Sequence, residues 1–158
     1  MIDKPQIKTT AEQHTACIRL KVTLAEMMQA FGPAVEELVA TLTKQGMPPT
    51  GAAFAHHFRI TGGDGVPKEF DFEVGFTTEK PVAPAGRVYA SQWPAQRVAH
   101  TTYHGPYEGL PDAWGEFTDW MEASGLKRAE DLWEHYVTGP QTTPDSSQWR
   151  TEIYRPLL

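Results

Sequence analysis

The chain has 158 residues, and a hydrophobic content of 40% with 22% charged residues fits one folded domain of ordinary size. This composition excludes a disordered chain, and no apolar run approaches the roughly 20 residues that a membrane helix needs. The formal net charge is −6, and no Lys/Arg cluster is present, so direct nucleic-acid binding is disfavoured.

The first half of the chain predicts a strand, a helix and two further strands. Residues 1–13 are polar and are expected to be irregular, whereas residues 14–23 alternate between apolar and polar side chains and predict a strand. Thr23 and Glu26 have the spacing of a capping box at the start of a helix over 24–45. Gly32-Pro33 interrupts that helix, which leaves a start of the helix proper near Pro33 as the alternative.

Gly46 is the expected end of this helix, because glycine readily adopts the left-handed conformation that ends helices. Two strands are then predicted over 52–60 and 70–76, joined by a glycine-rich turn at 61–65. The second of these strands alternates cleanly and has one aromatic face. A linker with two prolines, Pro81 and Pro84, follows it.

The second half predicts the same order of elements. Its helix follows Gly105-Pro106, carries an apolar stripe at three- and four-residue steps, and ends at Ser124-Gly125. Trp114, Phe117 and Trp120 are expected to pack this helix on the strands. The predicted strands of this half are 86–91, 96–104, 131–138 and 149–158, with a polar loop at 139–148.

A shift by half the chain length superposes the two halves. Gly46 then falls on Gly125, and Glu73 falls on Glu152. The agreement of element order, helix ends and strand carboxylates indicates an internal duplication. We therefore expect one α+β domain over 1–158, built from two strand–helix–strand–strand modules at about 14–80 and 86–158. Two antiparallel sheet halves would carry helices on one side and a central ligand groove on the other.

The last predicted strand places Glu152 and Tyr154 on one face and Ile153 on the other, because side chains alternate along a strand. A carboxylate in a central strand is costly to bury unless it is paired or hydrogen-bonded. The ordinary alternative is an edge strand with Glu152 in water.

Four short motifs of the second half occur in an order that resembles a known family. They are Tyr103-His104-Gly105-Pro106-Tyr107, Trp120 with Ser124-Gly125, Glu134-His135-Tyr136, and the segment from Thr151 to Leu157. Together they resemble the GyrI-like effector-binding domain, which is the ligand domain of AraC-type and MerR-type multidrug regulators and also exists as a stand-alone protein. Arg59 and the segment from Phe72 to Phe76 extend the resemblance into the first half.

The resemblance implies a groove for hydrophobic, often planar and cationic compounds. Aromatic residues stack on the ligand there, and a buried glutamate carboxylate pairs with its positive charge. The expected ligand-binding residues are Glu152, Glu134, Tyr136, Tyr154, Tyr103, Trp93, Tyr107 and Glu73. The tyrosines could equally be ordinary core or surface residues, and Trp93 could be a groove lid or a surface tryptophan in a loop. Only about a dozen residues precede the first predicted strand, so no DNA-binding region is expected.

Three functions follow from these observations. The first is binding of a hydrophobic or cationic small molecule without catalysis, with no cofactor. The second, implied by stand-alone relatives that this chain resembles, is hydrolysis of cyclopropanoid DNA-alkylating compounds. Glu152 or Glu134 would be the general base and Tyr103 would steady the developing oxyanion. The third is a gyrase-inhibitor-like protein interaction, to which no local feature points.

Metal and thiol chemistry are not expected. His56 and His57 are adjacent on a strand and so point to opposite faces, and no closely spaced ligand set is present. Cys17 is the single cysteine, which rules out an intramolecular disulfide and favours a reducing compartment. The segment after Met1 is not a signal peptide, so we expect a cytoplasmic protein without membrane association. The sequence does not indicate an oligomeric state.

Overall fold

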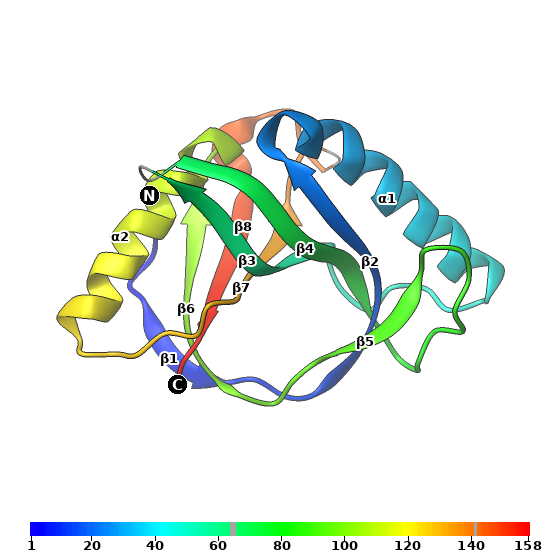
Figure 1. The fold of residues 1–158 in the computed structure, drawn as a ribbon, viewed down its shortest axis with the longest axis horizontal. Coiled ribbons are helices and arrows are strands. Elements are labelled where there is room, and N and C mark those ends of the chain that lie inside the picture. The colour runs from blue at the N-terminus through cyan, green and yellow to red at the C-terminus, as the bar shows by residue number, and fades with distance from the viewer. Residues whose placement is uncertain (64–65, 141) are drawn as a thin grey trace. The chain divides into compact units, whose positions relative to one another are not determined.

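The computed structural model describes residues 1–63, 66–140 and 142–158 and has the predicted α+β fold (Figure 1). The chain forms two compact units. We call residues 11–95 the α1 unit, and residues 1–10 with 96–158 the α2 unit, after the helix that each contains. Within the described residues, each unit has four antiparallel strands and one α-helix.

The α1 unit contains the predicted strand–helix–strand–strand order followed by one further strand. Its elements are β2 (Gln13–Thr23), α1 (Leu24–Lys44), β3 (Phe54–Gly63), β4 (Val66–Thr78) and β5 (Tyr89–Trp93). The strands lie side by side in the order β3-β4-β2-β5. The predicted turn at 61–65 is wrong for residues 61–63, which still belong to β3, while 64–65 fall outside the described residues. The strand expected at 86–91 begins only at Tyr89 and runs to Trp93.

Helix α1 starts at Leu24 and continues through Pro33, so the alternative start near Pro33 is wrong. The capping box fixes the earlier start: the Thr23 backbone N–H donates to the Glu26 carboxylate at 2.9 Å, and the Thr23 hydroxyl donates to the same oxygen at 2.8 Å. A proline inside a helix removes one backbone hydrogen bond, and here that loss does not end the helix.

The α2 unit repeats the same order and adds the N-terminal strand. Its elements are β1 (Gln6–Thr9), β6 (Arg97–His104), a 3-10 turn η1 (Tyr107–Gly109), α2 (Leu110–Ala123), β7 (Leu132–Thr138), a second 3-10 turn η2 (Ser146–Gln148) and β8 (Arg150–Pro156). The strands lie in the order β1-β6-β8-β7. The expectation of an irregular N-terminal segment is wrong, because Gln6 to Thr9 pair with β6. All four residues of β1 are exposed, and an exposed edge strand needs no apolar alternation.

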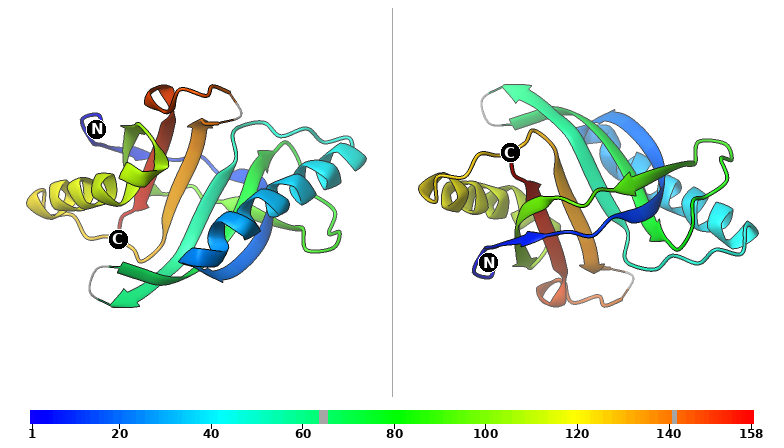
Figure 2. Two further views of the ribbon diagram at one scale, coloured as in Figure 1. Left: turned by 90° about the horizontal axis from the view of Figure 1, so that it is seen from above. Right: turned by 90° about the horizontal axis from the view of Figure 1, so that it is seen from below.

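Each helix covers one face of the strands of its own unit (Figure 2). Leu38 and Leu42 of α1 are fully buried, as are Phe117 and Met121 at the corresponding positions of α2. In the α2 unit, α2 packs on Ile153 of β8 and on residues of β6. The opposite strand face of each unit is not covered by the unit's own helix. No helix in the described parts of the chain is long and apolar enough to cross a membrane.

Candidate functional site

Glu73 lies on the polar face of the α1 unit. Its neighbours in β4, Phe72 and Val74, belong to the core, and alternation places Glu73 on the opposite face. Arg19 of β2 and His56 of β3 lie beside it in register. Glu73 is nevertheless only 2% exposed, so this carboxylate is removed from water. A buried carboxylate requires hydrogen-bond donors, and its neighbours supply them.

Both oxygens of Glu73 have hydrogen-bonding neighbours. The Tyr89 hydroxyl donates to Oε2 at 2.5 Å, and the Nδ1 atom of His56 lies 3.2 Å from Oε1. The Cys17 thiol donates to the Thr15 hydroxyl at 3.4 Å and feels the charge of this carboxylate. The pKa of the Cys17 thiol is raised mainly by burial and further by the charge of Glu73. The pKa of Tyr89 is raised mainly by burial and further by its hydrogen bond to Glu73. Both groups therefore stay protonated, and Tyr89 remains a donor to Glu73.

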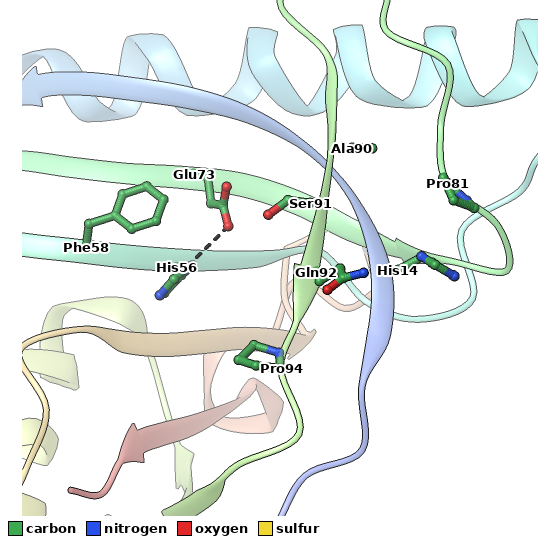
Figure 3. A pocket seen from close by; sticks show the side chains of 9 residues that line it. All are labelled: His14, His56, Phe58, Glu73, Pro81, Ala90, Ser91, Gln92 and Pro94. Atoms are coloured by element: carbon green, nitrogen blue, oxygen red, sulfur yellow. Dashed lines mark hydrogen bonds and ion pairs between the residues drawn. The ribbon is translucent and has the colours of Figure 1, made fainter.

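An open pocket of about 590 Å³ lies over this carboxylate (Figure 3). Its lining comes from β2, β3, β4, β5 and the two connections that flank β5: His14, His56, Phe58, Glu73, Pro81, Ala90, Ser91, Gln92 and Pro94. Figure 3 shows His56 pointing toward Glu73, with the Ser91 hydroxyl on the other side of the carboxylate. The pocket thus combines one buried carboxylate with an aromatic ring and two prolines.

The aromatic ring of the pocket already contacts a cation of the protein. The Arg19 guanidinium lies 4.9 Å from the centre of the Phe58 ring, within the range of a cation–π contact. Arg19 is held there by two hydrogen bonds to Asp71, at 3.0 and 2.9 Å. The His56 ring meets Phe58 edge-on at 4.6 Å between centroids. Phe58 therefore lies between a permanent cation and the imidazole that touches Glu73.

Glu152 occupies the corresponding position in the α2 unit. It lies opposite His135 in the β7–β8 register, as His56 lies opposite Glu73. The Tyr154 hydroxyl donates to Glu152 at 3.2 Å. The Tyr154 ring stacks on His100 at 4.3 Å, and the Lys8 ammonium lies 5.1 Å from its centroid. Glu152 is half-buried, so the alternative of a fully solvated edge carboxylate is wrong.

Glu134 lies on the helix face of the same unit. Its register partner is Ile153, which packs on α2. The Trp114 indole N–H donates to one oxygen at 2.8 Å and the Tyr136 hydroxyl donates to the other at 2.9 Å. Burial, and then the Glu134 charge, raise the pKa of Tyr136. Trp114 thus has a polar role beyond the expected helix packing.

Tyr107 and Tyr103 also lie on the helix side. The Tyr107 ring contacts Tyr136 at 5.7 Å and Trp149 at 5.1 Å between centroids. Tyr103 is buried in the α2 core, and its hydroxyl donates to the Pro106 carbonyl at 2.7 Å.

The predicted site residues therefore divide into three groups. Glu134, Tyr136, Tyr107 and Tyr103 share the helix face of the α2 unit, Glu152 and Tyr154 share its opposite face, and Glu73 and Trp93 belong to the α1 unit. Because successive residues of a strand point to opposite faces, Glu134 and Glu152 do not face one ligand within their unit. Trp93 is 4% exposed at the end of β5 and is not a surface loop tryptophan.

Tyr89 is the functional neighbour that the sequence did not reveal. Tyr89 lies in a short predicted strand that follows the proline-containing linker. Its contact with Glu73 depends on the pairing of β5 with β2. The alternation of β4 alone indicated Glu73, but no local pattern indicates which tyrosine reaches it. Among the described residues, no three His, Cys, Asp or Glu side chains are grouped closely enough to hold a metal ion.

A duplicated strand–helix–strand–strand arrangement, with carboxylates held by aromatic donors, defines an α+β domain of the small-molecule-binding class. The chain belongs to the GyrI-like family: residues 3–158 match the GyrI-like small molecule binding domain. No curated protein matches the chain in sequence.

Solved structures share this fold at low sequence identity. The crystal structure of the EcmrR C-terminal domain is 21% identical, with a TM-score of 0.84 over 98% of this chain and 97% of that one. The chain spans 57% of EcmrR in its cryo-electron microscopy complex with DNA. A hydrolase encoded by lin2189 from Listeria innocua is 13% identical, with a TM-score of 0.70 over 98% and 92% of the two chains. SAV2435, solved bound to tetraphenylphosphonium, is 11% identical, with a TM-score of 0.69 over 99% and 94%.

Proposed function

We propose that this domain binds hydrophobic organic cations, and that the pocket over Glu73 receives the cationic part of the ligand. The observation that carries this proposal is a carboxylate only 2% exposed in the wall of an open pocket. A charge that is shielded from water attracts a cation more strongly than an exposed one does, because the local dielectric constant is lower. A similar fold, SAV2435, was solved with the lipophilic cation tetraphenylphosphonium, which agrees with this choice of ligand class.

The aromatic part of the pocket supports the same ligand class. Phe58 already accepts the Arg19 guanidinium on its ring, so the electrostatics of this ring suit a cation. The two prolines and Ala90 add apolar surface to the lining. A planar or bulky cation would bury its hydrocarbon parts against these residues while its charge lies near Glu73.

Titration calorimetry with tetraphenylphosphonium tests the proposal. We expect Glu73→Gln to weaken binding about tenfold or more, since an ion pair at short range in a partly desolvated site is worth several kcal/mol before desolvation is subtracted. Glu69→Gln is the matched control, because Glu69 lies on the same strand, is exposed and is not part of the pocket lining. Equal affinities for the Glu73→Gln variant and the unchanged protein would contradict the assignment of this pocket.

Two further variants locate the ligand if Glu73 is not its partner. Glu152→Gln and Glu134→Gln make the same chemical change on the two faces of the α2 unit. Loss of binding in only one of them would move the site to that face. Absence of tetraphenylphosphonium binding to the unchanged protein would remove the proposed function altogether.

Hydrolysis of an electrophilic ligand is the second candidate. The specific observation in its favour is the shielded Glu73 carboxylate in the pocket wall, because a carboxylate that is close to a bound electrophile can accept a proton from an attacking water. Incubation with a cyclopropanoid alkylating compound, followed by mass spectrometry, tests for a ring-opened product. A product that disappears in Glu73→Gln or Glu152→Gln would establish the reaction and identify the base.

A further inference from the structure

The hydrogen bonds that Glu73 already accepts restrict the kind of cation that can bind beside it. Tyr89 occupies Oε2 at 2.5 Å, and His56 lies 3.2 Å from Oε1. A carboxylate can only accept, so the His56 nitrogen that faces it is the donor in this contact. Each oxygen of Glu73 thus already accepts one hydrogen bond, which takes two of the roughly four acceptor positions of a carboxylate.

We propose, building on the cation-binding function above, that this pocket selects cations without N–H groups over primary ammonium ions of the same shape. A primary ammonium brings three donors, and each donor that stays unpaired after leaving water costs free energy. A quaternary ammonium or phosphonium has no donors and is attracted to Glu73 through space alone. The class of ligand is therefore a permanently charged, donor-free organic cation.

The remaining lining offers few acceptors to an ammonium group. Phe58, Pro81, Ala90 and Pro94 present ring or aliphatic carbon to the pocket. Ser91 has the hydroxyl beside the carboxylate, Gln92, which is exposed, has a side-chain carbonyl, and His14 and His56 can each accept through one ring nitrogen. These neutral acceptors are spread over four residues, whereas the three donors of an ammonium radiate from one atom, so an ammonium close to Glu73 would leave donors unpaired or hydrated.

Tyr89 is the residue that sets this selectivity. It lies on β5 opposite Cys17 in register, and its hydroxyl reaches the buried carboxylate from the edge strand of the unit. Removing that hydroxyl frees an acceptor position on Oε2 without removing the ring. The Tyr89→Phe variant therefore separates selectivity for donor-free cations from cation binding as such.

The test uses two ligands that differ only at nitrogen: 1-naphthylmethyl-trimethylammonium and 1-naphthylmethylammonium, each competed against tetraphenylphosphonium at pH 7. We expect the unchanged protein to prefer the trimethyl compound by about tenfold or more, the factor that one unpaired donor corresponds to. The three methyl groups of the trimethyl compound also favour its binding, because they bury more apolar surface. The deciding quantity is therefore the change in the ratio of the two affinities between the unchanged protein and Tyr89→Phe.

In Tyr89→Phe the preference is expected to shrink about fivefold or more, chiefly because the primary ammonium binds more tightly to the freed oxygen. The affinity for tetraphenylphosphonium is measured in the same variant, so that any general change in cation binding is divided out of the preference, and urea unfolding shows that the variant is folded. In Ser91→Ala the primary ammonium should lose affinity while the trimethyl compound does not.

An unchanged protein that binds the primary ammonium as tightly as the trimethyl compound would overturn the inference. So would a preference that is the same in Tyr89→Phe. If tetraphenylphosphonium and both naphthyl cations fail to bind, the proposed function itself fails and this inference falls with it, which is a separate and distinguishable result.

Discussion

Gly46 and Gly125 end the two long helices with the same hydrogen-bonding pattern. Both adopt left-handed backbone conformations, with φ of 66° and 69°. The N–H of the residue after each glycine donates to the carbonyl five residues earlier, Met47 to Leu42 at 2.9 Å and Leu126 to Met121 at 3.0 Å. This is the Schellman arrangement, and it occurs at positions related by half the chain length.

Gly46→Ala and Gly125→Ala should therefore destabilise the fold by similar amounts. A side chain at either position would meet no atom within 4 Å, so the cost comes from the backbone alone. We expect about 1 kcal/mol for each, measured as the free energy of unfolding in urea, because an L-residue pays about that much in the left-handed region.

Gly115→Ala is the control for this pair. Gly115 lies inside α2, and a Cβ there also has free space, but its φ is not positive. Alanine should stabilise the helix at this position by about 0.5–1 kcal/mol. A destabilising effect of the same size at all three glycines would show that the loss does not arise from helix termination.

Trp114→Phe should destabilise the α2 unit through Glu134. The substitution keeps an aromatic ring but removes the indole N–H that donates to the carboxylate at 2.8 Å. A hydrogen bond to a charged, half-buried group is worth about 1.5 kcal/mol or more, so the urea midpoint should fall accordingly. Trp120→Phe is the matched change on the same helix, where the indole stacks on Phe117. Equal losses in both variants would mean that ring size, and not the bond to Glu134, decides the result.

Much of the fold could be predicted because its signals are local. The capping box at Thr23 and the left-handed glycine at Gly46 depend on a few neighbouring residues, and the alternation of β4 depends only on strand period. The polar strand β1 carries no such signal, because an exposed edge strand is stabilised by backbone hydrogen bonds to β6. Pro33 does not mark the start of α1, since the capping box ahead of it keeps the first turns helical.

The candidate site was harder to predict because its partners are distant in sequence. Alternation places Glu73, Glu134 and Glu152 on strand faces, but it does not show which face packs on a helix. The contact of Trp114 with Glu134 follows from how α2 packs, and the contact of Tyr89 with Glu73 follows from the pairing of β5 with β2. Such pairings across the chain leave no trace in the local sequence.

Cys17 should resist thiol reagents in the folded protein. Its side chain is fully buried, and burial together with the Glu73 charge raises the pKa of the thiol, so the reactive thiolate is disfavoured. We expect Ellman's reagent at pH 8 to react with the folded protein no faster than the rate at which the protein unfolds around Cys17. Full denaturation in urea should make one thiol per chain reactive. Rapid labelling of the folded protein without urea would contradict the buried position of this cysteine.

Stability should fall on acidification because His135 is buried in its neutral form. Burial, and then the nearby His100 and Lys8 charges, lower the pKa of His135 from its usual value of 6.5 to about 3. Between these pH values the unfolded chain binds a proton that the folded chain does not, so stability is lost as the pH falls below about 6.5. The contribution of one such group is up to about 1.4 kcal/mol per pH unit.

Urea unfolding between pH 7.5 and 4 measures this slope. His135→Gln removes the titrating group and should flatten the slope by up to one proton, and His104→Gln, which changes an exposed histidine, should leave it as it is. Lys8→Met should flatten the dependence of stability on pH in part, because the Lys8 charge lowers the pKa of both His135 and His100. The effect is partial because burial is the larger cause for both histidines. If His135→Gln has the same slope as the unchanged protein over this range, a neutral buried His135 is not the origin of the acid sensitivity.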